Sequence, residues 1–319
     1  MDKVKPNGIE FEISPVCIGT APYGSDLKVE KCYEVMDCFY EMGGNLIDTA
    51  NFYANWLPVE RSISEKTIGK WMYERNNRHD MIISTKGGHP LYETLDVPRL
   101  SKAEILYDID DSLKNLKTDY VDIYFLHRDN EAVPVFEMID ALNTIIKSGK
   151  ARSIGLSNWK PYRIEQAMKY CKDENLAEIK FSQIEFGLAL PNYGAYDMTT
   201  EYMDFNAYEF YKKNKINTLS CSSQSGGYFF CNDDSGNPLF NKKFSNDRNL
   251  KMHKYIKSLC KKYDCSAASI IISALTSNQD FCTVPILGCM NAEQVKSSAG
   301  GLELRLEKDE IKKLLSRSV

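Results

Sequence analysis

The stretch Val16-Cys17-Ile18-Gly19-Thr20-Ala21-Pro22-Tyr23-Gly24 separates two folds that both alternate strands with helices. It has the pattern of a short buried strand followed by a turn, and its glycines lack the G-x-G-x-x-G spacing that opens a doubly wound dinucleotide-binding sheet. Similar runs, apolar on both faces as buried parallel strands are, follow at residues 46–48, 81–85, 121–126, 153–156, 180–184, 216–221 and 281–285. Eight alternations favour an α/β protein with the (β/α)8 TIM barrel architecture, as a single domain over residues 1–319.

The segments between these runs carry helix signals. Ser101-Lys102-Ala103-Glu104 matches a capping box, and Gly43-Gly44 is typical of a helix end. We expect helices at residues 31–42, 64–75, 101–116, 134–147, 161–171, 205–213, 250–263, 266–276 and 292–299. Residues 8–14 alternate and suggest a short N-terminal β element at the barrel floor. Two long βα loops, 192–202 and 223–249, are interpreted as binding loops, with disordered insertions as the alternative.

Composition narrows the class of protein. A net charge of −4 with scattered basic residues argues against a nucleic-acid partner. No apolar stretch approaches the ~20 residues of a membrane span, and the N-terminus does not resemble a secretory signal. We therefore expect a cytoplasmic protein whose ten dispersed cysteines are reduced. The four histidines show no metal-ligand spacing, so no metal site is predicted.

Polar side chains follow three consecutive predicted strands. Asp48 ends the second, with Tyr53 shortly after it; Lys86 and His127 end the third and fourth. Residues at these ends converge on one pocket in a barrel. A Lys86 ammonium ~4 Å from the Tyr53 phenol favours the phenolate by about 4 kcal/mol at an effective dielectric near 20. Tyr53 could then exchange a proton near neutral pH.

In this scheme Asp48 pairs with Lys86 and holds it in place. Neutral His127 orients a carbonyl oxygen and stabilises its developing negative charge. A hydrolase or aldolase that uses Lys86 as a Schiff base is an alternative, but it would not need Asp48 and Tyr53 alongside.

Asp48, Tyr53, Lys86 and His127 together resemble the Asp–Tyr–Lys–His tetrad of the aldo-keto reductases, and the likeness covers essentially the whole chain. Further similar segments are Asn45-Leu46-Ile47-Asp48-Thr49-Ala50, residues 113–122, Ile154-Gly155-Leu156-Ser157-Asn158 and Val284-Pro285-Ile286-Leu287-Gly288. The resemblance implies a barrel that binds a nicotinamide cofactor in extended form, with Tyr53 as the proton donor to a carbonyl. It also implies that Ser157, Asn158 and Gln183 hold the carboxamide, that Asp48 lies near the ribose, and that Gly19, Thr20 and Ala21 border the same end.

Two segments depart from the family pattern. Cys221 stands where an aromatic residue commonly stacks on the nicotinamide, unless Phe186 or Tyr228 substitutes for it. The following segment, with Ser222, Gln224 and Gly226, still offers backbone N–H groups to a pyrophosphate. Around Asn291 and Gln294 the basic residues that usually hold the 2′-phosphate of NADP are missing. We therefore expect NADP with weakened preference, NAD being used as well or instead.

The substrate expected is a small carbonyl compound or alcohol. Tyr23, Trp56, His89 and Trp159 follow strand ends and are predicted to wall its pocket, with core packing as the alternative for each. The tryptophans suit either a sugar face or an apolar carbonyl compound. The leading function is an NAD(P)-dependent oxidoreductase that interconverts an aldehyde or ketone, possibly sugar-derived, and its alcohol. The alternative is a non-catalytic, cofactor-binding module that senses redox state.

Overall fold

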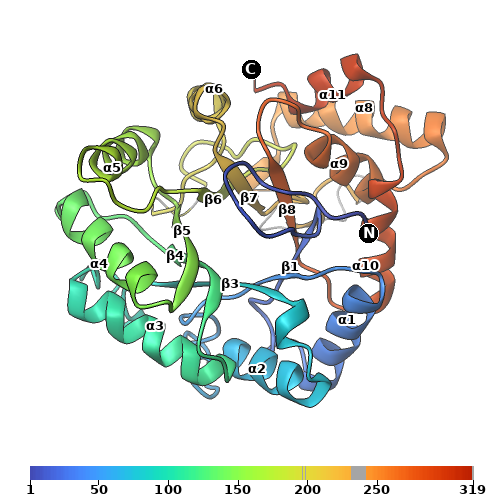
Figure 1. Ribbon diagram of the computed structural model, residues 1–319. Coiled ribbons are helices and arrows are strands. Elements are labelled where there is room, and N and C mark those ends of the chain that lie inside the picture. Colours follow the sequence, from blue (N-terminus) through green and yellow to red (C-terminus); the bar gives the residue numbers. More distant parts are fainter. Residues whose placement is uncertain (196, 198, 231–241, 318–319) are drawn as a thin grey trace.

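Eight parallel strands form a closed barrel in which each strand pairs with its neighbours in chain order (Figure 1). The computed structural model describes residues 1–195, 197, 199–230 and 242–317. The strands are β1 (Cys17–Gly19), β2 (Leu46–Asp48), β3 (Ile82–Gly87), β4 (Val121–Leu126), β5 (Ala151–Ser157), β6 (Phe181–Glu185), β7 (Asn217–Cys221) and β8 (Thr283–Leu287). The predicted barrel is thereby confirmed.

Two strands, β3 and β8, end two residues later than predicted. β3 continues through Ser84, Thr85 and Lys86 to Gly87, all of them buried. The apolar pattern ends this strand at Thr85. Lys86 extends it because its buried side chain is paired with Asp48, which the pattern of apolar residues cannot show. β8 also ends two residues later than expected, at Leu287, but the two added residues are apolar.

Helices surround the barrel (Figure 1). They are α1 (Val29–Glu41), α2 (Ile63–Arg75), α3 (Lys102–Leu116), α4 (Val135–Lys147), α5 (Pro161–Asp173), α6 (Phe205–Asn214), α8 (Asp247–Tyr263), α9 (Ala267–Thr276), α10 (Ala292–Ala299) and α11 (Lys308–Leu315). Short 3-10 helices are η1 (Arg78–Asp80), η2 (Tyr92–Thr94), η3 (Ser225–Gly227) and η5 (Gly300–Leu302). The sequence analysis did not predict α11. The capping box of α3 is confirmed, with Ser101 and Glu104 bonded in both directions.

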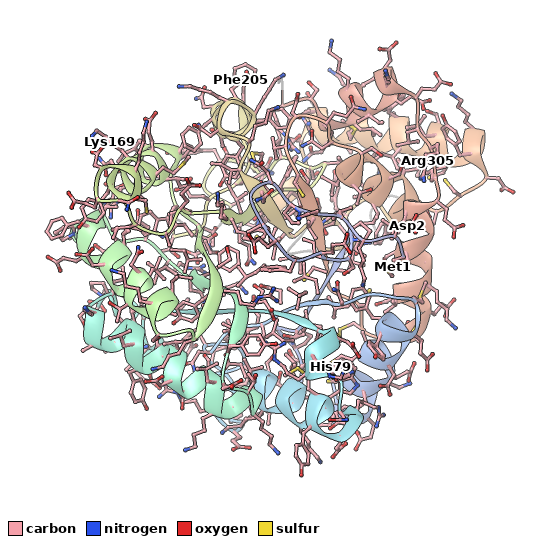
Figure 2. All side chains as sticks on the ribbon, in the orientation of Figure 1. Met1, Asp2, His79, Lys169, Phe205 and Arg305 are labelled. Carbon is pink, nitrogen blue, oxygen red and sulfur yellow. The ribbon has the colours of Figure 1, made fainter. Side chains whose placement is uncertain are left out.

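Close helix packing explains one glycine. A Cβ on Gly69 of α2 would lie 2.4 Å from the carbonyl oxygen of Asn115 and 2.7 Å from the backbone of Leu116. Only a residue without a side chain therefore lets α2 and α3 approach this closely. The labelled side chains of Lys169 and Phe205 lie on the outside of the helix ring (Figure 2). No helix in the described ranges is long and apolar enough to cross a membrane.

The N-terminal segment closes one end of the barrel, where it crosses the strands in Figure 1. Ile9 and Ile13 pack with inward-facing residues such as Leu46, Phe125 and Phe181. The expected β element at residues 8–14 is wrong in detail, because the segment makes a single antiparallel bridge between Val4 and Ile13. Apolar burial, rather than a ladder of backbone hydrogen bonds, holds this segment.

The two long loops are described in part. Residues 196, 198 and 231–241, with Cys231 among them, lie outside the described residues. In the loop after β7, η3 precedes the gap and α8 begins at Asp247. The cysteines in the described part of the chain are free thiols.

Candidate active site

The carboxyl ends of β2, β3 and β4 bring the four predicted catalytic residues together. Lys86 Nζ donates to Asp48 Oδ2 at 2.7 Å and to the Tyr53 hydroxyl at 3.0 Å. The Tyr53 and His127 rings lie edge to face, with centroids 5.8 Å apart. This cluster brings a phenol, a cation and an imidazole together.

Lys86 is fully buried and saturated with acceptors. Besides Asp48 and Tyr53, it donates to the carbonyl oxygen of Thr49 at 2.7 Å. Burial lowers the pKa of Lys86, whereas Asp48 and Tyr53 together raise it by a larger amount. The pKa of Lys86 is therefore above its ordinary value. A Schiff base requires a neutral amine, so this environment disfavours Lys86 as a nucleophile.

Asp48 is held by neutral donors as well as by Lys86. Ser84 Oγ and Gln183 Nε2 donate to its Oδ1 at 2.8 and 3.0 Å. Asp48 therefore has fixed partners on both oxygens, and it fixes the position of the ammonium in turn.

The pKa of Tyr53 shifts in the direction opposite to the expected one. Burial raises the pKa above its ordinary value of 10.0, while Lys86 lowers it by a smaller amount. The sequence pattern showed the cation but not how completely the phenol is removed from water. A protonated Tyr53 at neutral pH is the form that can give a proton to a carbonyl oxygen.

His127 is neutral in this environment. Burial first, then the charges of Arg128 and Lys86, lower its pKa well below 6.5. Its Nδ1 is buried and has no hydrogen-bond partner among the described residues. A buried, unpaired polar atom beside a phenol fits a site that completes its hydrogen bonds when a ligand binds.

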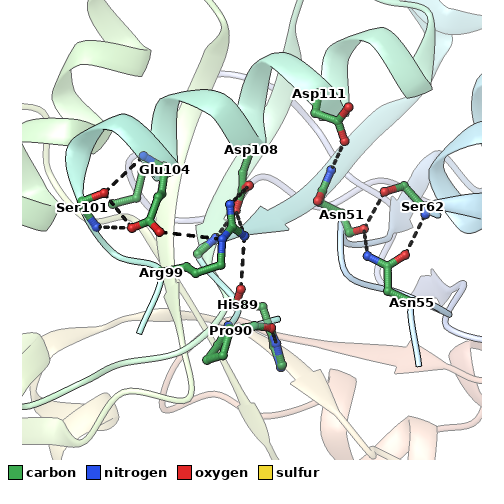
Figure 3. A network of polar contacts seen from close by, with 12 residues as sticks. Asn51, Asn55, Ser62, His89, Pro90, Arg99, Ser101, Glu104, Asp108 and Asp111 are labelled. Atoms are coloured by element: carbon green, nitrogen blue, oxygen red, sulfur yellow. Dashed lines mark hydrogen bonds and ion pairs between the residues drawn. The ribbon is translucent and has the colours of Figure 1, made fainter. Parts of the chain in front are cut away.

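A polar network behind the site fixes the turn that carries Tyr53 (Figure 3). The Asn51 backbone N–H donates to the carbonyl of Lys86, and its side chain donates to Asp111 at 2.8 Å. Ser62 and Asn55 both donate to the Asn51 carbonyl. The turn is thus tied to β3 and α3.

Glu65 lies buried in the same network. It accepts from Thr85 at 2.6 Å and from Asn115 at 3.1 Å. Burial raises its pKa to about 7.

A cavity of about 930 Å³, here called the large cavity, opens from Asp48 and Tyr53 toward α8, α9 and α10. Its lining includes these residues predicted to bind a cofactor: Gly19, Thr20, Ala21, Asp48, Cys221, Ser222, Gln224, Gly226 and Gln294. The volume is within the range of ligand pockets.

Four predicted cofactor residues do not line the large cavity. Gln183 bonds to Asp48, and Asn158 Nδ2 donates to the His127 carbonyl and to Ser157 Oγ, so these three lie against the tetrad. Asn291 instead caps α10, where its Oδ1 accepts from the backbone of Gln294.

Some lining residues were missed. Phe229, Phe230 and Lys257 line the large cavity, but no local motif distinguishes them in the sequence. Phe186, one proposed substitute for the missing aromatic residue, is buried against Tyr208 and Phe281 instead. Tyr228 packs on Phe229, Phe244 and His253. Neither proposed substitute lines the large cavity.

The predicted substrate wall is partly wrong. Tyr23 and Trp159 are 0% and 1% exposed and belong to the hydrophobic core, which is the alternative that the sequence left open for them. The His89 ring stacks on that of Phe52, with centroids 3.7 Å apart. The centroid of the His89 ring lies 4.8 Å from that of His127. Trp56 is 40% exposed and packs beside Phe52. Phe52 was not predicted, although it precedes Tyr53.

Comparison with known proteins agrees with this geometry. The model of the Aldo/keto reductase family matches residues 15–317. The chain is 25% identical to an aryl-alcohol dehydrogenase of Pestalotiopsis microspora over 95% of its own length and 78% of the relative's. It is 23% identical to an uncharacterized oxidoreductase of Bacillus subtilis over 95% and 92%. A match to norsolorinic acid reductase B of Aspergillus parasiticus is 30% identical, over 53% of this chain and 46% of that protein.

Proposed function

This chain belongs to the aldo/keto reductase family, and we propose that it is an oxidoreductase that interconverts an aldehyde or ketone with its alcohol, using NADP or NAD. The observation that carries the proposal is the buried Lys86 ammonium, 2.7 Å from Asp48 and 3.0 Å from the Tyr53 hydroxyl. A cation fixed between a carboxylate and a phenol serves proton transfer at the phenol oxygen.

The residues present fit a nicotinamide cofactor. The large cavity begins at the tetrad, and its lining offers serine hydroxyls and glycine backbone at Ser222, Ser223 and Gly226. Successive backbone N–H groups in such turns bind anions such as a pyrophosphate. Beside the tetrad, the amides of Asn158 and Gln183 are the candidates to hold the carboxamide. When bound, the cofactor supplies a hydride to the carbonyl carbon or accepts one from the alcohol.

The chain's own residues handle the proton and the charge. Tyr53 donates its hydroxyl proton to the carbonyl oxygen as negative charge develops there, and Lys86 stabilises the phenolate that remains. Neutral His127 hydrogen-bonds the same oxygen and orients it. Asp48 keeps Lys86 protonated and in place. In alcohol oxidation the Tyr53 phenolate takes the proton back.

The choice between the two cofactors depends on the outer end of the large cavity. Within the described part of the chain, no arginine lines this cavity, and Lys257 is its lysine. Arginine is the side chain suited to bidentate phosphate binding. We therefore keep the hypothesis of a weakened NADP preference. Measuring kcat/KM with NADPH and with NADH tests it, and an NADPH advantage of about a hundredfold or more would refute it.

The substrate is proposed to be an aryl carbonyl compound, with a sugar-derived one as the second class. The stacked pair of Phe52 and His89, with Trp56 beside it, provides aromatic surface near the tetrad. An aryl-alcohol dehydrogenase among the relatives supports the same class.

Turnover of a panel of aryl aldehydes, aliphatic aldehydes and aldoses, followed by loss of NADPH or NADH absorbance, tests the function. We expect the aryl aldehydes to react fastest. If the protein binds the cofactor but turns over none of these aldehydes, the redox-sensing alternative is favoured. Cys221, in place of the usual aromatic residue, is the feature that supports that alternative.

A further inference from the structure

A second cavity adjoins the tetrad. This small cavity, of about 290 Å³, is lined by His89, whose ring centroid lies 4.8 Å from that of His127. Leu95, Pro98 and Leu100 give it apolar walls, and Arg128 and Asp197 provide charge. Its size and walls suit the far end of a small substrate whose carbonyl lies at Tyr53.

Arg128 connects the small cavity to the catalytic residues. Its Nη1 donates to the carbonyl oxygen of His127 at 3.1 Å, and Asn158 Nδ2 donates to the same oxygen at 3.1 Å. The guanidinium therefore lies beside the amide expected at the nicotinamide end.

The other charges around the small cavity are well paired. Arg99 forms two short contacts with Asp108, at 2.7 and 3.1 Å, and also donates to the His89 carbonyl (Figure 3). Asp129 accepts two hydrogen bonds from Arg163, at 2.9 and 2.8 Å. Because Arg99 and Asp129 already have close partners of opposite charge, neither needs a ligand to neutralise it.

Arg128 is compensated more weakly. Its ion pair within the described residues runs from Nη2 to Asp197 Oδ2 at 3.9 Å. The Arg128 side chain is 17% exposed, whereas that of Asp197 is 57% exposed. Burial lowers the pKa of Arg128, and Asp197 opposes this shift by a smaller amount.

We propose that Arg128 is a specificity-determining residue that binds a carboxylate on the substrate, so that the preferred substrates are carbonyl compounds or alcohols bearing a carboxylate. This inference rests on the proposed function. A single guanidinium offers two parallel N–H groups, which match the two oxygens of a carboxylate. Asp197 already presents a carboxylate to the same guanidinium, at a distance that a substrate can improve.

The kinetic test compares 4-formylbenzoate with methyl 4-formylbenzoate, which lacks the negative charge at the far end and carries one additional methyl group there. We expect wild type to prefer the carboxylate by about tenfold or more in kcat/KM, and Arg128→Gln to lose that preference, so that its kcat/KM values for the two substrates are similar. Lys160→Gln, which removes an equal charge from an exposed pair with Glu131, is the matched control and should keep the preference. An Arg128→Gln enzyme that retains the preference, or a wild type that lacks it, overturns the proposal.

A binding test separates this proposal from the proposed function. 4-Methylbenzoate has no aldehyde to reduce. Calorimetric titration with it should give a Kd about tenfold higher for Arg128→Gln than for wild type. If neither aldehyde is turned over but this difference is found, the oxidoreductase assignment fails and the carboxylate site stands. If wild type and Arg128→Gln bind 4-methylbenzoate equally well, Arg128 is not a carboxylate site, whatever the activity of the enzyme.

Asp197→Asn adds a result that loss of folding cannot mimic. It removes the internal competitor for Arg128 while retaining a side chain that can bond to Thr199. We expect tighter binding of 4-methylbenzoate than in wild type. Unchanged or weaker binding would contradict the role given to Asp197.

Discussion

Replacing Lys86 by methionine removes the ammonium that joins Asp48 to Tyr53 but keeps a stem of similar length. The change leaves the Tyr53 phenolate without the cation 3.0 Å away. It also leaves the Asp48 carboxylate with only its neutral donors, Ser84 and Gln183, among the described side chains. The variant therefore has two consequences, one for catalysis and one for stability.

The catalytic consequence follows from Coulomb's law. Two unit charges 3.0 Å apart attract by about 5 kcal/mol at an effective dielectric of about 20. Alcohol oxidation needs the phenolate, so its kcat near neutral pH should fall about a thousandfold, each tenfold corresponding to about 1.4 kcal/mol. Breaking a buried ion pair by removing one partner should cost about 3–5 kcal/mol of unfolding free energy.

The assay measures kcat for alcohol oxidation across the alkaline range, together with urea unfolding of the same samples. Lys70→Met is the matched control, because Lys70 is exposed and pairs with Glu74 at 3.7 Å on one face of α2. It should change neither quantity appreciably. A folded Lys86→Met enzyme with wild-type kcat and pH profile would refute the reasoning.

Three other predictions follow from the same contacts. Reduction by wild type should keep a constant kcat up to about pH 9, because burial holds the pKa of Tyr53 above 10.0, whereas oxidation should rise with pH over that range; a reduction rate that falls from pH 7 would contradict this. Burial raises the pKa of Glu65 from 4.5 to about 7. Between these two pH values the folded protein binds more protons at Glu65 than the unfolded protein does, so its stability falls as the pH rises. Denaturation at pH 5 and pH 8 should show wild type losing about 3 kcal/mol relative to Glu65→Gln, and equal pH dependence would count against it. Gly69→Ala should destabilise by about 2 kcal/mol or more in thermal unfolding, because its Cβ would meet backbone at 2.4 Å, while Gly300→Ala, with 3.7 Å of room, should not.

The sequence predicted the fold well because the barrel repeats one simple pattern. Short apolar runs such as Val121–Leu126 match the structure residue for residue, since such strands are buried on both faces. It failed where the pattern was not apolar. The polar residues of β3 are buried through mutual pairing, and the segment around Ile9 and Ile13 is held by packing without a strand.

The candidate site was predicted as far as chemistry alone identifies residues. An acid, a phenol, an amine and an imidazole at consecutive strand ends point to one proton-transfer site. Burial decided what sequence could not: it raised the pKa of Tyr53 and placed Tyr23 and Trp159 in the core. Arg128 was visible beside His127 in the sequence, but its weak pairing depends on Asp197, which is distant in the chain.

The most direct test of the central claim removes one oxygen atom. Tyr53→Phe deletes the hydroxyl that lies 3.0 Å from Lys86 Nζ and retains the ring against His127. We predict that this variant binds NADPH or NADH as wild type does, measured by nicotinamide fluorescence, and has no detectable turnover of any aldehyde that wild type reduces. A Tyr53→Phe enzyme with full activity would contradict the account.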